Sequence, residues 1–388
     1  MNTMGIKYIC PYDYSGYGTA ARRVLIGLRN AGIPFTWAPM VVGKGWDLWY
    51  EPFTGRGVGD PELDLWCNRD IPYDTVIVHL VPEYLLRWRH LEPGKRLILH
   101  TAWETDRIPH HWRFFLELAD LILVPSTWNR SVFQQAGLRV PVEVFPHIAQ
   151  EFRHIPGSPP FFIPDNDFVF YAIESWTGRK ALGDVIRCFL NTFSKDDPVT
   201  LALKTSRRDL TRIRPFLRLA GTRRAVNRLL SDYKNPAHLC LITCDLPSDD
   251  QQRLHLRGGC YVSMSHGEGW GLGSFDAAAY GKPVITTRHG GALDYLPEDT
   301  AYLVNCRMVP VDDDWGKPSF AGDQQWAQAD PVHASVLMRH VFENRKDAAE
   351  RGQRLQLRIR ERFNERTVIG RLMELVHGCR LGTSSDSA

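Results

Sequence analysis

Residues 265–285 read SHGEGWGLGSFDAAAYGKPVI and contain two acidic residues, Glu268 and Asp276, with seven positions between them. The run just before, CYVSMS (260–265), is apolar and predicts a buried strand. A glycine-rich loop follows, and a short helix is predicted over 274–280, with Asp276 in its first turn. A loop between the carboxyl end of a strand and a helix is the usual ligand-binding place of a parallel α/β sheet.

The chemistry of this loop favours an anionic ligand. Glycines let the backbone approach a ligand closely, and a helix N-terminus offers unpaired N–H groups with a partial positive charge. A phosphate would suit the helix N-terminus. Glu268 lies between Gly267 and Gly269 and would then lie beside the group attached to that phosphate. Asp276 alone could equally serve to complement the helix dipole. A charged side chain between two glycines has no such structural explanation.

Apolar runs of the buried-strand type recur in two halves of the chain, with helical stretches between them. A proline-rich segment without periodicity, 153–167, separates the halves and predicts a linker. The fold class predicted is therefore α/β, with two Rossmann-like parallel-sheet domains facing a cleft. The expected strands are 6–10, 74–80, 96–103 and 120–126 in the first half, and 168–173, 199–205, 238–244, 260–265 and 282–287 in the second.

Length and composition fit this interpretation. The chain has 388 residues, 44% of them apolar and 23% charged, which is typical of a globular protein with two domains. A net charge of +3 is too small to indicate a partner. We expect no membrane span, because no apolar run reaches about 18 residues. The eight cysteines form no CxxC pair and are expected to be reduced, which favours a cytoplasmic protein, with a peripheral place at the membrane as an alternative.

The segment GEGWGLGSFDAAAYGKPVITTRHGG (267–291) resembles the donor-site signature of the retaining nucleotide-sugar glycosyltransferases of family 4, which have the fold called GT-B. Their pattern has two glutamates with seven residues between them. Glu268 matches the first, and Asp276 takes the second place with a side chain one methylene shorter. Gly281 and Pro283 also fall where the pattern has them.

The resemblance continues upstream of this signature. SGYGTAAR (15–22) is similar to the glycine loop of the N-terminal domain, and LILHTAWETDRIP (97–109) to the strand end that brings a histidine to the site. SWTGRKALGDVIRCF (175–189) resembles the stretch with the phosphate-binding basic pair, which here is Arg179 and Lys180. Many members have an arginine six residues before the lysine of this pair, at the position where this chain has Glu174. The charge of a diphosphate is thus left mainly to the basic pair and Lys204.

The resemblance implies a role for each matching residue. Glu268 would bind hydroxyls of the transferred sugar, and His100 would contact that sugar near the reacting carbon. A histidine at a strand end is otherwise more often structural, and the matching segment favours the catalytic role. Asp276 would bind the ribose hydroxyls. The donor-binding residues implied are Gly16, Arg179, Lys180, Lys204, Gly269, Trp270, Gly271, Leu272 and Asp276.

By this resemblance the chain is expected to be a metal-independent hexosyl- or pentosyltransferase. Its donor would be a nucleoside-diphosphate sugar, without a further cofactor, and its acceptor a glycan or a lipid-linked glycan. The expected domains are an acceptor-side domain over 1–160 and a nucleotide-sugar domain over 161–350. A C-terminal helix over 351–380 is expected to pack back toward the N-terminal domain, and 381–388 to be disordered.

Three other interpretations compete with this one. VDDDWG (311–316) is similar to the metal-binding DxD motif of the other glycosyltransferase fold, but it follows both predicted sheets, so no metal site is predicted there. A glycoside hydrolase would also use two carboxylates, but it needs no basic pocket for a diphosphate. The arginine-rich stretch Arg207–Arg228 is most simply a solvated surface. It also leaves open a nucleic-acid partner, with transfer to a hydroxymethylated base in DNA as the alternative function.

Overall fold

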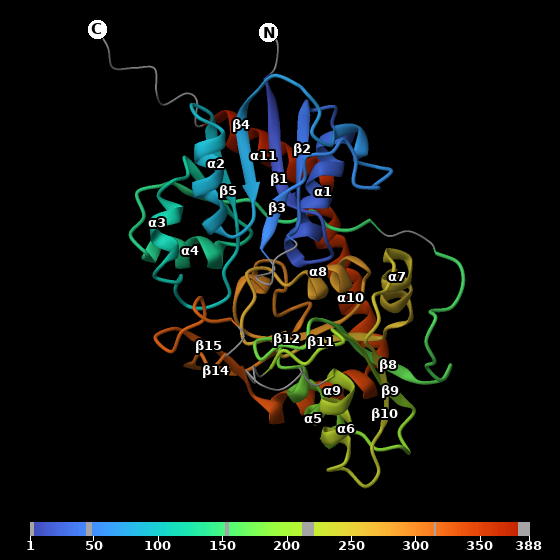
Figure 1. Cartoon of the computed structure of the whole chain (residues 1–388). Helices are drawn as coiled ribbons and strands as arrows, with labels where there is room; N and C mark the ends of the chain where they lie inside the picture. Colours follow the sequence, from blue (N-terminus) through green and yellow to red (C-terminus); the bar gives the residue numbers. More distant parts are fainter. Residues whose placement is uncertain (1–3, 44–48, 152–154, 212–220, 314–315, 379–388) are drawn as a thin grey trace. The chain divides into compact units, whose positions relative to one another are not determined.

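The computed structural model of the chain describes residues 4–43, 49–151, 155–211, 221–313 and 316–378 (Figure 1). These residues divide into two compact units. The first unit comprises the described parts of 1–103, 107–149 and 362–378, and the second comprises 104–106 and the described parts of 150–361.

The first unit is built on a seven-stranded sheet with the order β3-β2-β1-β4-β5-β6-β7. All neighbouring strands are parallel except β2 and β3, which are antiparallel. The central strands are continuous apolar runs, as in Val76–Val78 of β4, because helices cover both faces of such a sheet. The strands are β1 (Gly5–Pro11), β2 (Phe35–Val42), β3 (Tyr50–Pro52), β4 (Tyr73–His79), β5 (Arg96–His100), β6 (Leu121–Val124) and β7 (Val142–Val144).

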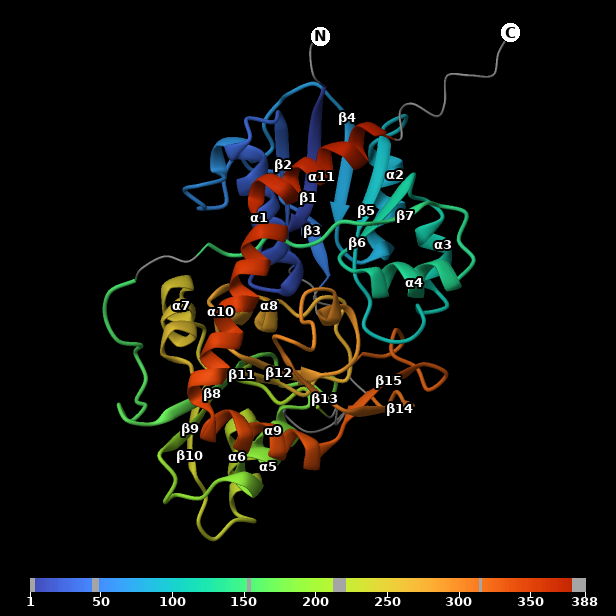
Figure 2. The same cartoon turned by 180° about the vertical axis from the view of Figure 1, so that it is seen from behind.

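Helix α1 (Gly16–Asn30) follows β1 directly and is capped by Ser15, whose Oγ accepts a hydrogen bond of 3.1 Å from the Gly18 N–H. The last helix, α11 (Glu365–Gly378), belongs to the same unit and lies against α1 (Figure 2). The two helices pack closely because Gly27 has no side chain. The other helices of this unit are η1 (Asp64–Trp66), η2 (Pro82–Tyr84), α2 (Leu85–Leu91), α3 (Trp112–Leu116) and α4 (Thr127–Gln135).

The second unit has a six-stranded parallel sheet with the order β10-β9-β8-β11-β12-β13. Its core lies between the sheet and helices such as α5 and α9, and Phe170, Phe189 and Met338 are fully buried in it. The strands are β8 (Phe168–Ile173), β9 (Val199–Lys204), β10 (His238–Ile242), β11 (Cys260–Ser263), β12 (Val284–Thr287) and β13 (Tyr302–Val304).

An antiparallel hairpin of β14 (Cys306–Pro310) and β15 (Gln325–Ala329) adds to the second unit and was not predicted. The C-terminal stretch forms three helices, α9, α10 and α11, with breaks near 344 and 363. The helix predicted over 351–380 is therefore divided between the end of α10 and α11. The helices of the second unit are α5 (Leu182–Thr192), α6 (Thr222–Leu230), α7 (Ser248–Arg257), α8 (Leu272–Ala279), η3 (Gly291–Asp294), α9 (Pro331–Glu343) and α10 (Arg345–Arg362).

The two largely parallel sheets confirm the predicted α/β class, but the predicted start of the helix after the glycine loop is wrong. Helix α8 begins at Leu272 and not at Ser274, because Gly271 adopts the left-handed conformation (φ +86°) and ends the loop there. Asp276 is therefore in the second turn of α8 and not in the first. The described cysteines are free thiols. None of the described helices is long and apolar enough to span a bilayer.

Candidate functional site

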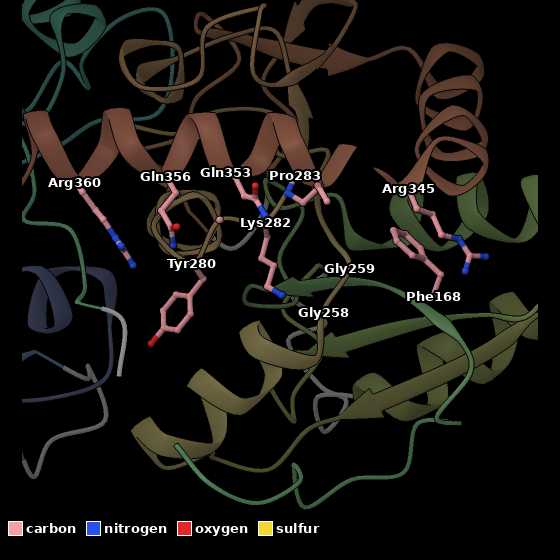
Figure 3. Close-up of a pocket in the computed structure, with 12 residues that line it drawn as sticks. Phe168, Gly258, Gly259, Tyr280, Lys282, Pro283, Arg345, Gln353, Gln356 and Arg360 are labelled. Atoms are coloured by element: carbon pink, nitrogen blue, oxygen red, sulfur yellow. The ribbon is translucent and has the colours of Figure 1, made fainter. Parts of the chain in front are cut away.

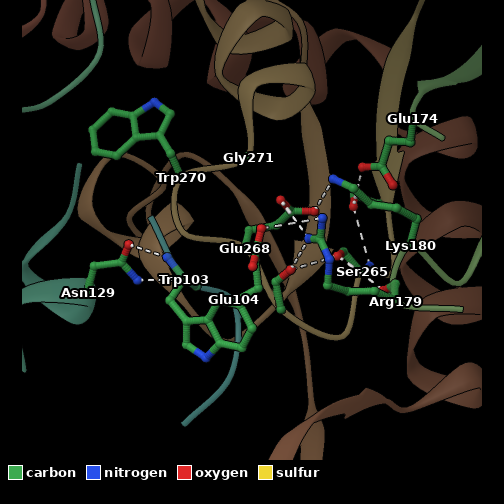
Figure 4. A network of polar contacts seen from close by, with 12 residues as sticks. Trp103, Glu104, Asn129, Glu174, Arg179, Lys180, Ser265, Glu268, Trp270 and Gly271 are labelled. Carbon is green, nitrogen blue, oxygen red and sulfur yellow. Dashed lines mark hydrogen bonds and ion pairs between the residues drawn. The ribbon is translucent and has the colours of Figure 1, made fainter. Parts of the chain in front are cut away.

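Charged side chains gather at the carboxyl edge of the second sheet. Glu174 follows the last residue of β8, and Arg179 and Lys180 lie in the next loop, before α5. Glu268 comes from the glycine loop after β11, and Glu104 from the short segment 104–106 of the same unit. Figure 4 shows these five side chains pointing toward one another. We call them the charge cluster.

Glu268 is the central acid of the charge cluster. Its Oε1 lies 2.5 Å from Lys180 Nζ, and its Oε2 lies 3.4 Å from an Arg179 nitrogen. Burial opposes ionisation of Glu268, but Lys180 and then Arg179 outweigh it and hold the pKa of Glu268 at about 2. Glu268 is therefore a carboxylate at any physiological pH, in direct contact with both members of the basic pair.

The other two acids are held differently. Glu104 Oε1 lies 3.6 Å from Arg179 Nη2. Glu174 Oε1 accepts hydrogen bonds from Ser263 Oγ (2.7 Å) and Tyr261 Oη (3.3 Å). Burial raises the pKa of both acids, although the neighbouring cations act in the opposite direction.

No motif in the sequence indicates Glu104 as a site residue. Its position depends on tertiary contacts of its neighbours: Thr105 Oγ1 donates to Gln324 Oε1 (3.1 Å), and the Asp106 N–H donates to the carbonyl of Gln325 (3.0 Å). Both partners lie some two hundred residues further along the chain, so no local pattern could have identified Glu104.

The glycines of the loop are required by close backbone contacts. A Cβ on Gly267 would lie 1.8 Å from the carbonyl oxygen of Glu104, and one on Gly290 would lie 2.8 Å from that of Glu268. Tyr295 fixes the end of the loop, since its hydroxyl donates to the carbonyl of Gly271 at 2.9 Å. The backbone carrying Glu268 is therefore held from both sides, and its side chain is presented in a fixed direction.

The remaining predicted donor residues of this unit lie around the charge cluster. Lys204 ends β9 and pairs in register with Ile173, the residue before Glu174. Trp270 is 3% exposed, and its ring packs against that of Tyr295 with the ring centroids 4.8 Å apart. The Trp270 side chain therefore belongs to the core. Gly269 and Leu272 belong to the loop and to the first turn of α8, and Asp276 is partly exposed on α8.

The predicted residues of the first unit lie at the carboxyl edge of its sheet. His100 ends β5, is 1% exposed and stacks on His79 with ring centroids 3.7 Å apart. Burial, then His79 and His147, hold the pKa of His100 well below its usual range, so the imidazole is neutral. Neither ring nitrogen of His100 has a hydrogen-bond partner among the described residues.

Gly16 is the first residue of α1 and is exposed at this edge of the first sheet. The more tightly packed glycine of the motif is Gly18, where a Cβ would lie 2.4 Å from the carbonyl oxygen of Asp13. The motif SGYGTAAR thus combines a packing glycine with an exposed one that a ligand could approach.

A groove of about 560 Å³ lies at the opposite, amino edge of the second sheet (Figure 3). One wall is a face of α10, including Gln353 and Gln356, and the other is the chain before β11 and β12, including Lys282. Among the described residues that line this groove, none is acidic. It is a different site from the charge cluster, which lies beyond the other ends of the same strands.

The parts of the chain that the structure describes contain no group of three or more His, Cys, Asp or Glu side chains placed to hold a metal ion. In VDDDWG, residues 314–315 lie outside the described residues, and the Asp313 carboxylate accepts a hydrogen bond of 2.8 Å from the Gly316 N–H. Asp313 and Gly316 both lie in the connection from β14 to β15.

No protein-family model matches the chain, and no curated protein matches it significantly in sequence. Solved structures do resemble it. HepE of Anabaena in complex with UDP-glucose is 14% identical, with 97% of this chain and 100% of that chain covered and a TM-score of 0.65. A sucrose-phosphate synthase of Thermosynechococcus elongatus is 13% identical, with 98% and 100% covered and a TM-score of 0.67.

A glycosyltransferase of Rickettsia africae is 14% identical, with 99% of this chain and 100% of that chain covered and a TM-score of 0.64. These neighbours are GT-B glycosyltransferases. At such low identity the likeness establishes the fold, and it confirms the predicted class of two Rossmann-like parallel-sheet domains.

Proposed function

We propose that the protein is a retaining glycosyltransferase that moves a sugar from a nucleoside-diphosphate sugar to a glycan or a lipid-linked glycan. The observation that carries this proposal is the position of Glu268, ionised and paired with Lys180 and Arg179 in a glycine loop before a helix N-terminus. The family resemblance of the loop supports it. HepE, a structural neighbour solved with UDP-glucose, supports a nucleotide sugar as the donor.

The chemistry required is the cleavage of a sugar–phosphate bond. The nucleoside diphosphate leaves with additional negative charge, which Arg179, Lys180 and the N-terminus of α8 would stabilise as it develops. When a diphosphate takes these cations, the Glu268 carboxylate loses its partners and becomes free to accept hydrogen bonds from hydroxyls of the sugar. Because the protein itself supplies these positive charges, the scheme uses neither a metal ion nor a further cofactor.

The resemblance also gives roles to residues outside the charge cluster. His100 would contact the transferred sugar near the reacting carbon, which suits a neutral imidazole with two free nitrogens, one a donor and one an acceptor. Asp276 would bind the ribose hydroxyls, and Gly16 would lie against the diphosphate.

A second acceptor class is DNA with hydroxymethylated bases. The observation that favours it is an exposed arginine surface on and before α6, formed by Arg207, Arg208, Arg223, Arg224 and Arg228. Residues 212–220 of the arginine-rich stretch lie outside the described residues. Such a surface would bind phosphates without reading sequence. We favour the glycan acceptor, because one basic surface in a chain of net charge +3 is weak support for nucleic acid.

A thermal-shift panel of nucleotide sugars tests the donor. The true donor should raise the melting temperature, since a ligand at 100 times its dissociation constant stabilises the native state by about 2.7 kcal/mol. NMR of the transferred sugar should then show the anomeric configuration of the donor, and activity should persist in EDTA. A panel in which nothing binds would contradict the proposal, and an inverted product would contradict retention. Sugar transfer to hydroxymethylated DNA but not to glycans would favour the second acceptor class.

A further inference from the structure

The charge cluster holds more acids than bases. Arg179 and Lys180 provide two positive charges, and Glu104, Glu174 and Glu268 can provide three negative ones. The diphosphate of a nucleotide sugar would add about two more negative charges at the same cations. Lys204 and the N-terminus of α8 are proposed to compensate part of this charge, but excess negative charge in a partly buried site is unfavourable, and a neutral acid in the cluster would favour binding of the diphosphate.

Glu174 is the acid of the cluster whose negative charge is compensated least by its neighbours. Glu268 has Lys180 at 2.5 Å and Glu104 has Arg179 at 3.6 Å. Among the described residues, no basic nitrogen lies within ion-pair distance of Glu174, and its Oε2 is buried without a hydrogen-bond partner. A buried carboxylate oxygen without a partner is unfavourable, and a proton lowers this cost because it removes the buried negative charge.

The other contacts of Glu174 also favour its protonated form. Ser263 and Tyr261 of β11 both donate to Oε1, which leaves Oε2 as the place for a proton. On the backbone, the Glu174 N–H donates to the carbonyl of Lys204. Burial raises the pKa of Glu174; Lys180 opposes this, Glu268 reinforces it, and Arg179 has a smaller opposing effect. A diphosphate that neutralises both cations would remove the opposing effects and leave those that favour the proton.

We propose that Glu174 takes up a proton from solvent when the diphosphate of the donor enters the charge cluster, and releases it when the nucleoside diphosphate leaves. Glu174 is then neutral in the complex and not a third negative charge. Glu174 is thus a positioning residue for the donor. This inference rests on the proposed function, since it requires a diphosphate at Arg179 and Lys180.

Titration calorimetry can measure how many protons the protein takes up when the nucleotide sugar binds. The probe is the nucleotide sugar that stabilises the protein most in the thermal-shift panel. Each of its phosphates carries one ester bond and one anhydride bond, and so lacks the ionisation near pH 6 of a phosphate monoester. Binding enthalpies measured at one pH in buffers of different ionisation enthalpy give the number of protons exchanged. We expect net uptake of up to about one proton, and an affinity that falls by up to about tenfold per pH unit as pH rises.

Glu174→Gln should abolish this uptake and make the affinity independent of pH, because the amide copies the neutral acid. The matched control is Glu104→Gln, which should keep the uptake. If Glu174→Gln folds poorly, infrared difference spectra of the wild type should still show the carbonyl stretch of a protonated carboxyl group appearing on binding. Binding without proton uptake, uptake that persists in Glu174→Gln, or uptake that Glu104→Gln abolishes would overturn the assignment alone. A panel without any binder would overturn the proposed function and this inference together.

Discussion

The two edges of the second sheet each hold a partly buried lysine, and the two lysines have opposite surroundings. At the carboxyl edge, Lys180 Nζ lies 2.5 Å from a Glu268 carboxylate oxygen. At the amino edge, Lys282 Nζ donates to the carbonyl of Leu256 at 2.9 Å, in a groove whose lining residues include no acid. Burial, with the charge of Arg257 as a smaller cause, lowers the pKa of Lys282 to about 8.

The difference shows what a buried charge requires. A carboxylate partner keeps the charge of a buried lysine, whereas a carbonyl partner does not compensate for lost solvation. At the carboxyl edge the Lys180–Glu268 pair therefore stays charged, so that a bound diphosphate can replace Glu268 as the partner of Lys180, whereas the lysine of the amino edge is close to losing its proton. We expect mutations at the carboxyl edge to affect function, and mutations at the amino edge to affect stability.

The largest effect is expected from removing the central charge of the carboxyl edge. Glu268→Gln should lower the kcat of sugar transfer on the order of 100-fold, because the side chain keeps its size but loses the carboxylate proposed to hold the sugar. Glu298→Gln, at an exposed acid that pairs with Arg288, is the matched control and should leave kcat unchanged. Near-normal turnover in folded Glu268→Gln would remove Glu268 from the mechanism.

A smaller effect is expected when either cation of the basic pair is lost. Arg179→Ala and Lys180→Ala should each weaken the binding of the free nucleoside diphosphate of the donor that the thermal-shift panel identifies, about 10- to 100-fold, since a hydrogen bond to a charged group contributes about 1.5–3 kcal/mol. Lys282→Met is the control from the amino edge and should bind that nucleoside diphosphate like the wild type. Calorimetry that finds equal affinity in both alanine variants would show that the diphosphate binds elsewhere.

The carboxyl edge was largely predictable from the sequence. Apolar runs identified β8, β9 and β11, and the spacing of acids and glycines identified Glu268. The start of α8 was missed by two residues, because the left-handed conformation of Gly271 depends on the packing of Tyr295 against the loop.

Features that depend on distant contacts were not predictable. Glu104 joins the second unit through residues near 324, far along the chain. The hairpin of β14 and β15 has no alternating apolar pattern strong enough to predict it. The groove of Lys282 was not predictable either, since α10, which forms one wall, lies more than sixty residues further along the chain.

The smallest effect is expected at the amino edge, in stability and not in activity. The pKa of Lys282 is about 8 in the folded protein against 10.5 in the unfolded chain, so burial opposes folding in full below pH 8. Between those two values the unfolded state binds more protons, and stability should rise with pH. Lys282→Met removes the charge and keeps the length of the side chain, and it should stabilise the protein at pH 7.

We expect a gain of about 1–2 kcal/mol, less than the full shift in pKa would give, because Lys282 is partly exposed and its bond to Leu256 is lost. Thermal unfolding of both proteins from pH 7 to pH 10.5 measures it, and the gain should shrink as pH rises, since the wild-type lysine loses its charge. Lys346→Met, at an exposed lysine of α10, should show no such trend. An equal loss of stability at every pH would instead mean that the bond to Leu256 and the packing of Lys282 outweigh the buried charge.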